Sequence, residues 1–233
     1  MNSTTRNFGS FEFDKNGVRF KYRIQTATGD HFDEIFEQLG YDFLKQERLN
    51  AAMNIISDFE AVEIHKSVWR DMVCNGTTLI ALVENDCVEQ GKIIGFNFTY
   101  VEKKDEDFSW ASSNKMCRQM SKVLSEVSRP GNIFEKYNVD RYLAAFGLMV
   151  HVDFAGSGIG YRLLESRQKL CKCLGLSATG TVFTGYISQH LATKLGFEVL
   201  SSLDDEHIDF GDIESHLDDT KGKDIKFMAL RYT

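Results

Sequence analysis

The spacing of apolar residues along the chain predicts alternating strands and helices. Residues 18–25 alternate apolar side chains with basic or polar ones, the period of two that is typical of a half-buried strand. Two amphipathic helices are predicted next, over residues 31–49 and 62–74. Asp30 precedes the first helix as a candidate cap, and Gly40 is expected to break it.

An antiparallel hairpin is predicted from two apolar runs, residues 78–84 and 93–101, because a turn-rich segment separates them. The polar residues 102–115 form a connection after this hairpin. Residues 117–128 are then predicted to be helical, until Pro130-Gly131 ends the helix.

The pattern changes to a parallel crossover in the second half of the chain. Residues 142–152 are almost continuously apolar, and a glycine loop, a helix over residues 159–174 and an apolar strand near residues 181–183 follow. This order predicts a βαβ unit with two parallel strands. The remaining elements are a short helix and two strands, over residues 187–195, 197–201 and 226–232. Together these elements predict one α/β domain on a mixed sheet.

Length and composition fit this single domain. The 233 residues are 42% apolar and 26% charged, enough to bury a real core. The longest apolar run, residues 144–150, is far shorter than the roughly 18 residues that a bilayer span requires. The first residues lack the hydrophobic core of a secretion signal. We therefore expect a cytoplasmic protein that has no membrane partner.

Charge and cysteine content exclude further classes of function. Residues 204–224 carry nine acidic residues against two lysines, an excess equal to the whole net charge of −7, and are expected to form a solvated loop. Basic runs are too short to follow a phosphate backbone, so nucleic acid is not an expected partner. The five cysteines form no C-x-x-C pair and the six histidines no H-E-x-x-H motif, which predicts reduced thiols and no metal site.

The segment with the most specific pattern is a loop that contains Gly156, Gly158 and Gly160, between a buried strand and an amphipathic helix. Glycines allow backbone N–H groups to approach a ligand closely, and the following helix N-terminus favours an anion such as phosphate. The loop lacks the Gly-Lys-Ser/Thr of a P-loop and the acidic residue that a dinucleotide fold needs about 20 positions on. A tight turn without a ligand is the alternative interpretation.

Residues 148–176 and 181–200 resemble the acetyl-CoA-binding core of the GNAT superfamily of N-acetyltransferases. The superfamily signature is Q/R-x-x-G-x-G/A after a strand, and a Lys-Leu-Gly-Phe helix end follows it, here residues 194–197. The resemblance implies a GNAT domain over residues 17–233, after an N-terminal extension of residues 1–16. That fold has a mixed, mostly antiparallel central sheet flanked by helices and a parallel βαβ core.

The same resemblance implies that acetyl-CoA is the co-substrate and that no metal is needed. The residues that it assigns to acetyl-CoA are Leu148, Met149, Val150, Ala155, Gly156, Ser157, Gly158, Ile159 and Gly160. One position departs from the signature, because Ala155 stands where the superfamily has Gln or Arg. The backbone amides of the loop would then hold the pyrophosphate without that side chain.

Within the superfamily, the chain looks most like the insect arylalkylamine N-acetyltransferases. Their D-E-P-L-N stretch, which supplies a catalytic Glu, matches residues 46–50, so Glu47 is the corresponding residue and Arg48 replaces the proline. The two serines that precede the helix end in that family fall on Thr184 and Ser188. The resemblance thus implies a catalytic set of Glu47, Ser188 and Thr184.

The chemistry of amide formation explains why such residues would be needed. An amine with a pKa near 10 is about one part in a thousand free base at neutral pH, so direct attack on a thioester requires a base, for which Glu47 is the candidate. Ser188, supported by Thr184, would protonate the leaving thiolate. Backbone N–H groups of residues 148–150 would stabilise the oxygen of the tetrahedral intermediate.

The expected function is therefore acetyl transfer from acetyl-CoA to a primary amine, and the resemblance favours an arylalkylamine such as dopamine, serotonin or tyramine. Two alternatives stay open. One is acetylation of a polyamine or a protein N-terminus, because Arg48 and the acidic residues 204–224 would reshape the entrance. The other is an inactive CoA-binding or interaction module, which Ala155 favours. Glu47 as a solvated surface carboxylate and Ser188 as a helix cap are the corresponding structural interpretations.

Overall fold

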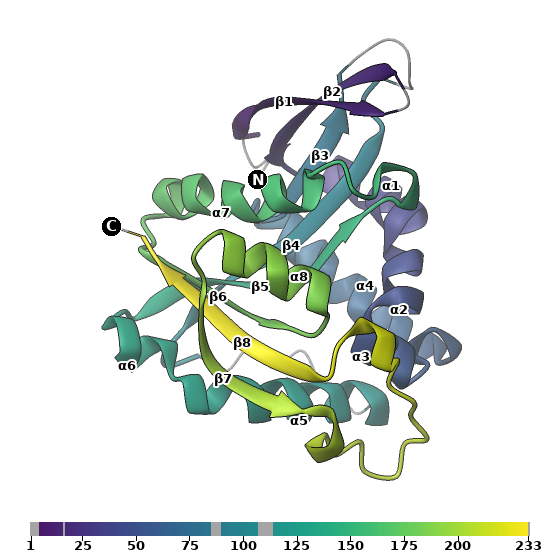
Figure 1. Cartoon of the computed structure of the whole chain (residues 1–233), viewed down its shortest axis with the longest axis vertical. Coiled ribbons are helices and arrows are strands. Elements are labelled where there is room, and N and C mark those ends of the chain that lie inside the picture. Colours follow the sequence, from purple (N-terminus) through teal and green to yellow (C-terminus); the bar gives the residue numbers. More distant parts are fainter. Residues whose placement is uncertain (1–4, 16, 85–89, 107–113, 233) are drawn as a thin grey trace.

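The strands of the protein form one mixed sheet. The computed structural model describes residues 5–15, 17–84, 90–106 and 114–232, and in this part of the chain the sheet has eight strands (Figure 1). They are β1 (Asn7–Lys15), β2 (Val18–Thr26), β3 (Leu79–Val83), β4 (Ile93–Lys103), β5 (Arg141–Val150), β6 (Ala178–Phe183), β7 (Glu198–Asp204) and β8 (Asp224–Arg231). Their spatial order is β1-β2-β3-β4-β5-β6-β8-β7.

All neighbouring strands are antiparallel except β5 and β6, which are parallel and joined by helix α7. The predicted hairpin is confirmed as β3 and β4, and the predicted crossover as β5, α7 and β6. The predicted α/β fold with a mixed, mostly antiparallel sheet is thus the observed one.

The longer helices are α4 (Phe59–Cys74), α5 (Lys115–Gly131), α7 (Ile159–Leu174) and α8 (Tyr186–Lys194). The shorter α-helices are α1 (Phe32–Ile35), α2 (Tyr41–Gln46), α3 (Arg48–Ala52) and α6 (Ile133–Tyr137). A π-helical turn, η2 (Phe36–Gly40), lies between α1 and α2. Short 3₁₀ segments complete the set: η1 (Gly29–His31), η3 (Ile55–Ser57), η4 (Val152–Phe154), η5 (Asp205–His207) and η6 (Asp219–Lys221). None of the described helices is both long and apolar enough to cross a bilayer.

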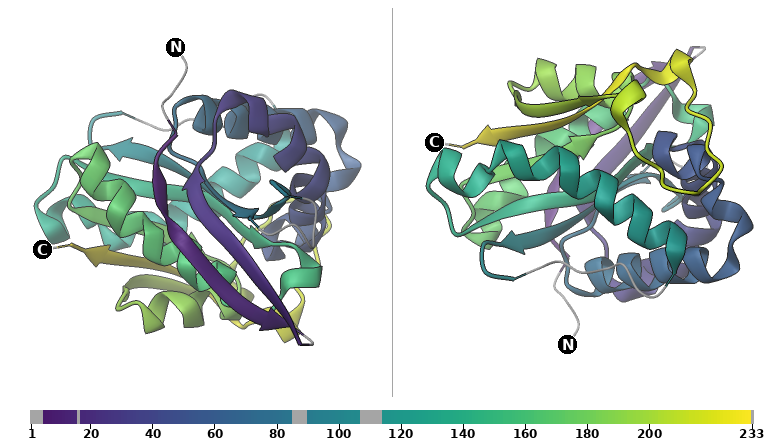
Figure 2. Two further views of the ribbon diagram at one scale, coloured as in Figure 1. Left: turned by 90° about the horizontal axis from the view of Figure 1, so that it is seen from above. Right: turned by 90° about the horizontal axis from the view of Figure 1, so that it is seen from below.

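Helices cover both faces of the sheet (Figure 2). Helices α1 to α6 contribute to a large apolar core on one face, where the Trp69 ring stacks on Phe98 with 4.7 Å between centroids. Helices α7 and α8 pack on the other face, where Leu163 and Leu164 are fully buried. Each face therefore has its own core, and the sheet separates the two.

Strand β1 lies within residues 1–16, the segment predicted to be an N-terminal extension. It pairs with β2 along its length, from Asn7↔Gln25 to Lys15↔Val18. Phe13 stacks on Phe20 of β2, so the aromatic residues of β1 face the α7 core. This segment is therefore an edge strand of the sheet.

The expected break at Gly40 is wrong. The chain stays helical through this residue, as the π-helical turn η2 followed directly by α2. A side chain at this position would lie 2.8 Å from the Phe36 ring, so glycine permits the close packing of the turn. The expected cap by Asp30 is also wrong, because Thr28 and His31 form a capping box at the start of η1.

Candidate active site

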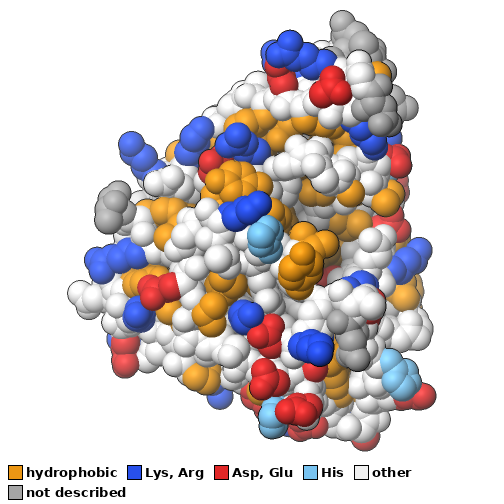
Figure 3. Space-filling view, in the orientation of Figure 1, with side chains coloured by type: hydrophobic (Ala, Val, Ile, Leu, Met, Phe, Trp, Pro, Cys, Tyr) orange, Lys and Arg blue, Asp and Glu red, His pale blue; other side chains and the backbone are white. Residues whose placement is uncertain are grey.

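A cavity of about 850 Å³ opens at the junction of β5, β6, α8 and the α2–α3 turn. The space-filling view shows a hollow on this face, between α8 and α2 (Figure 3). Every residue predicted for catalysis or for acetyl-CoA lines this one cavity, although these residues lie as far apart in the sequence as 47 and 188. Their juxtaposition is observed, and their roles remain predictions.

Strands β5 and β6 diverge and form a fork that opens into the cavity. Within the described residues, they share a single register pair, Leu143↔Thr179, and the Thr179 hydroxyl donates to the Leu143 carbonyl at 2.7 Å. A bulge in the pairing of β4 with β5 lies between Phe98 and Thr99, opposite Ala145 and Gly147 and so shortly after Leu143 along β5. Beyond the bulge, the edge of β5 that faces β6 has no partner strand among the described residues.

The orientation of the β5 amides follows from the ladder with β4. The His151 N–H donates to the Ile94 carbonyl at 2.9 Å, and groups on an antiparallel strand alternate in direction. The N–H group of Met149 therefore faces β4, while the N–H groups of Leu148 and Val150 face the fork. Of the three amides predicted to stabilise a developing oxyanion, two are thus available and the Met149 amide is not.

The glycine loop presents an open helix N-terminus to the cavity. Gly158 is the N-cap of the 16-residue helix α7 and provides no side-chain cap, so the first N–H groups of the helix remain open to a ligand. Gly156 and Gly158 have φ of 77° and 81°, the left-handed region that favours glycine, and nothing lies within 4 Å of either. Gly160 instead packs close to Leu191 of α8. These features fit the pyrophosphate of CoA.

A substitution at Ala155 tests whether the glycine loop binds the pyrophosphate, because the exposed Ala155 side chain lines the cavity beside Gly156. Ala155→Arg adds a cation, and a charge-assisted hydrogen bond contributes about 1.5 to 3 kcal/mol before side-chain ordering costs up to about 2. We expect acetyl-CoA to bind with unchanged to about tenfold higher affinity, and the gain to fade with salt. Titration calorimetry at two salt concentrations measures both. Weaker binding by a folded variant would place the pyrophosphate elsewhere.

Glu47 joins α2 to α3 and points its half-buried carboxylate into the cavity. Oε2 accepts from the Asn50 backbone at 2.9 Å and from its side-chain amide at 2.7 Å, while Oε1 accepts from the Leu49 N–H at 3.2 Å. The Thr184 hydroxyl donates to Oε1 at 2.5 Å. A carboxylate has about four acceptor sites, so Glu47 is held rigidly and is not a freely solvated side chain.

Thr184 lies on the turn from β6 into α8, and Ser188 lies in the first turn of α8 itself. Thr184 contacts Glu47 directly, so the structure brings these two together. The Ser188 hydroxyl donates to the Gly185 carbonyl at 2.8 Å, in the first turn of α8. The N-cap of α8 is Gly185, so Ser188 does not have the capping position that was its structural alternative.

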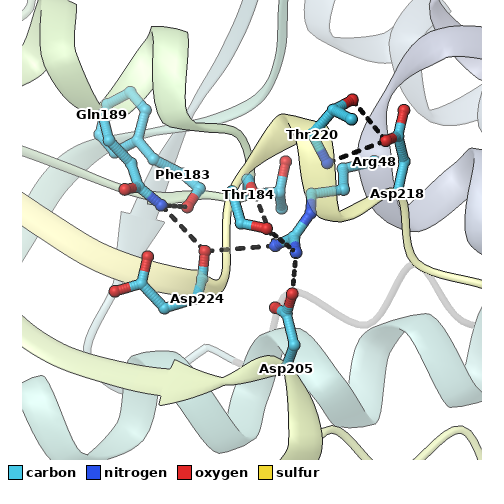
Figure 4. Close-up of polar contacts among 9 residues, drawn as sticks. Arg48, Phe183, Thr184, Gln189, Asp205, Asp218, Thr220 and Asp224 are labelled. Carbon is cyan, nitrogen blue, oxygen red and sulfur yellow. Dashed lines mark hydrogen bonds and ion pairs between the residues drawn. The ribbon is translucent and has the colours of Figure 1, made fainter.

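Arg48 is buried, although no pattern around it in the sequence indicates burial. Its side chain is 1% exposed and forms an ion pair with Asp205 at the end of β7. It also donates to the backbone carbonyls of Thr184, Gly222 and Asp224, at 3.2, 2.7 and 3.3 Å (Figure 4). Arg48 therefore fastens the Glu47 turn to the end of β6 and the start of β8. Asp205 belongs to the acidic segment that was expected to be a solvated loop.

A second buried arginine, Arg167 of α7, also lines the cavity and was not among the predicted site residues. A signal for it was present. Helix α7 buries an apolar stripe that includes Leu163, Leu164, Leu170 and Cys171, and Arg167 stands in the middle of it.

The described cysteines are free. The exposed Asp204, Glu206 and His207 lie close enough together to share an ion, but exposed acidic groups commonly cluster in this way without one. Burial lowers the pKa of His65, a cavity-lining residue whose Nδ1–H donates to the Ala61 carbonyl oxygen at 2.8 Å. His65 is therefore neutral at pH 7 and packs as part of the aromatic core.

Comparison with known proteins identifies the fold. No protein-family model and no curated protein matches the chain. A solved structure assigned as arylalkylamine N-acetyltransferase 7 of the yellow fever mosquito Aedes aegypti matches with a TM-score of 0.84 and 26% identity, over 99% of this chain and 96% of that one. Arylalkylamine N-acetyltransferase 2 of Aedes aegypti gives 0.79 and 20%, over 91% and 99%. A polyamine N-acetyltransferase of Drosophila melanogaster gives 0.70 and 19%, over 90% and 99%. The chain has the GNAT N-acetyltransferase fold, in the form found in insect arylalkylamine N-acetyltransferases.

Proposed function

We propose that the protein transfers an acetyl group from acetyl-CoA to the nitrogen of a primary arylalkylamine. The observation that carries this proposal is one cavity that joins three features: the open N-terminus of α7, the free amides of the β5 edge and the Glu47–Thr184 pair. The similarity to solved N-acetyltransferases supports the reaction type.

In this proposal, separate parts of the cavity bind acetyl-CoA and transfer the protons. The N-terminus of α7 holds the pyrophosphate of acetyl-CoA. The Leu148 and Val150 amides bind its pantetheine arm and its thioester oxygen. When bound, acetyl-CoA supplies an activated acetyl group. Because all acceptor sites of the Glu47 carboxylate are occupied, the amine proton reaches this carboxylate through the Thr184 hydroxyl. Thr184 takes the proton from the amine and passes its own hydroxyl proton to Oε1 of Glu47. Ser188 donates its hydroxyl proton to the departing thiolate and regains a proton from solvent.

Aromatic side chains favour an aryl substrate. On the α5 side the cavity is lined by the rings of Tyr100, Tyr142, Phe146 and Phe227. Rings at these positions can pack against an aryl group and attract a nearby ammonium group.

A polyamine is the second candidate substrate, and Glu102 favours it. This carboxylate lines the same cavity and accepts a hydrogen bond from Tyr100, whose pKa burial raises well above its usual value. A second ammonium group of a long amine would find its counter-charge there. The two candidates therefore differ in what the far end of the substrate contacts.

Acetyl-CoA should stabilise the protein before any amine is added. At 100 times its dissociation constant, a ligand adds about 2.7 kcal/mol to the free energy of unfolding, or roughly 5 to 11 °C in Tm for a domain of this size. Thermal melts with and without acetyl-CoA measure this. Release of free CoA with aryl amines, polyamines and N-terminal peptides then identifies the acceptor. An unchanged Tm at millimolar acetyl-CoA would contradict the proposal.

A further inference from the structure

Among the residues that the structure describes, the buried guanidinium of Arg167 has no opposite charge paired with it. Arg167 is only 1% exposed, and its hydrogen-bond partners are neutral side chains. Nε donates to Asn97 at 2.7 Å, and Nη1 donates to Thr181 at 2.8 Å and to Thr179 at 3.5 Å. Among the described residues, Nη2 has no hydrogen-bond partner and no carboxylate forms an ion pair with the group. A buried charge without an opposite charge is costly, so this cation is poised for an anion.

The position of this cation is the closed end of the fork. Thr179 forms the register pair that joins β5 to β6, and Arg167 contacts its hydroxyl. Asn97, the partner of Nε, donates to the Gly147 carbonyl at 2.7 Å, directly before the free Leu148 amide. Arg167 also lines the cavity. The unpartnered Nη2 thus belongs to a group that borders the space beneath the free edge of β5.

An acyl-CoA would bring its acyl group to this point. Arg167 lies eight residues beyond the start of α7, about 12 Å along the helix from the proposed pyrophosphate site. A donor whose pyrophosphate sits at that site, and whose arm follows the β5 edge, has its thioester and acyl group deepest in the fork. The tail of the acyl group is then the part of the donor that approaches the guanidinium.

We propose that Arg167 selects acyl donors whose acyl group ends in a carboxylate, such as malonyl-CoA or succinyl-CoA, over apolar acyl groups of the same shape. This inference rests on the proposed function, because it concerns the donor site of the same cavity. Acetyl-CoA remains a donor, because its acyl group is small and uncharged and needs no contact with the guanidinium. The carboxylate would supply the missing counter-charge through charge-assisted hydrogen bonds.

The charge of Arg167 persists at working pH. Burial lowers the pKa of its guanidinium to about 10, which is still far above 7, so the side chain is a cation in neutral solution. A buried pair is also screened little by salt. The preference should therefore survive high ionic strength, in contrast to contacts at the exposed glycine loop.

Equilibrium binding tests this without an amine. Isovaleryl-CoA has an isopropyl group where malonyl-CoA has its carboxylate, so the two donors match in shape and differ in charge. We expect calorimetry to show malonyl-CoA binding at least tenfold more tightly than isovaleryl-CoA, a difference of about 1.4 kcal/mol. In Arg167→Met the ratio should fall to one or below, and in Arg167→Lys it should remain above one.

A matched control lies on the same helix. Arg162 forms an ion pair with Glu165 at 2.7 Å and stacks over Phe11 of β1, 5.1 Å from its ring centroid. Arg162→Met removes one positive charge from α7 and should leave the donor ratio unchanged. If Arg167→Met does not fold, the ratio for the native protein and for Arg167→Lys still decides.

The outcomes separate the two proposals. Equal binding of the two donors to the native protein, or a ratio that Arg167→Met leaves unchanged, would overturn the selection of carboxylates and make Arg167 a structural residue. In either case acetyl-CoA would still raise Tm and support CoA release with an amine. Absence of any effect of acetyl-CoA would instead overturn the proposed function itself.

Discussion

Glu47→Gln is expected to slow acetyl transfer by about 10² to 10⁴, the range for a positioned general base. The amide keeps the shape of the side chain and can still accept from the Asn50 amide, so the α2–α3 turn should persist. It cannot take up a proton from Thr184. Steady-state kinetics with the best amine of the panel measures the loss. It should shrink at high pH, where more of the amine is free base.

Two controls define this result. Glu37→Gln changes an exposed carboxylate of the preceding π-helical turn and should leave turnover unchanged. Glu47→Gln should also show the native increase in Tm with acetyl-CoA, because it does not touch the glycine loop. Native turnover in Glu47→Gln at pH 7 would leave Glu47 as a structural cap of α3.

Arg48→Met should lower the free energy of unfolding by about 3 to 5 kcal/mol, the usual cost of removing one partner of a buried ion pair. Asp205 would keep a charge without its partner, and the carbonyls of Thr184, Gly222 and Asp224 would lose their donor. For a domain of this size the loss corresponds to roughly 6 to 20 °C in Tm. Chemical denaturation and thermal melts measure it.

An exposed arginine supplies the comparison. Arg70 pairs with Asp33 at 3.2 Å, with side chains 50% and 76% exposed, so Arg70→Met should cost less than about 1 kcal/mol. Adding Asp205→Leu to Arg48→Met should restore part of the loss, because it removes the unpaired charge. Equal small losses for Arg48→Met and Arg70→Met would show that Arg48 does not fasten the site.

Local patterns predicted most of the fold. The bounds of α7 match the predicted 159–174, because its apolar stripe, the glycines before it and Gly175 after it are all local signals. The hairpin of β3 and β4 was predicted for the same reason. Strand β1 was missed although Phe11 and Phe13 alternate with Glu12 and Asp14, a signal of period two that was present in the sequence.

What local patterns could not supply are contacts between distant segments. Arg48 is a charged residue beside a turn, a position that is usually solvated. It is buried because its acceptors come from residues 136 to 176 positions later in the chain. Arg167 is similar, since Asn97 and Thr181 reach it from strands β4 and β6. The candidate residues of the site were thus predictable by resemblance, while the supports that hold them were not.

The long reach of Arg48 has a consequence for biosynthesis. Its guanidinium is fastened only when Gly222 and Asp224 are in place, and β8, which begins at Asp224, lies between β6 and β7. A nascent chain still attached to the ribosome at β7 would have the glycine loop and Glu47 but an unclosed turn around Glu47. The turn around Glu47 can therefore be closed only after the segment through Asp224 at the start of β8 has emerged from the ribosome.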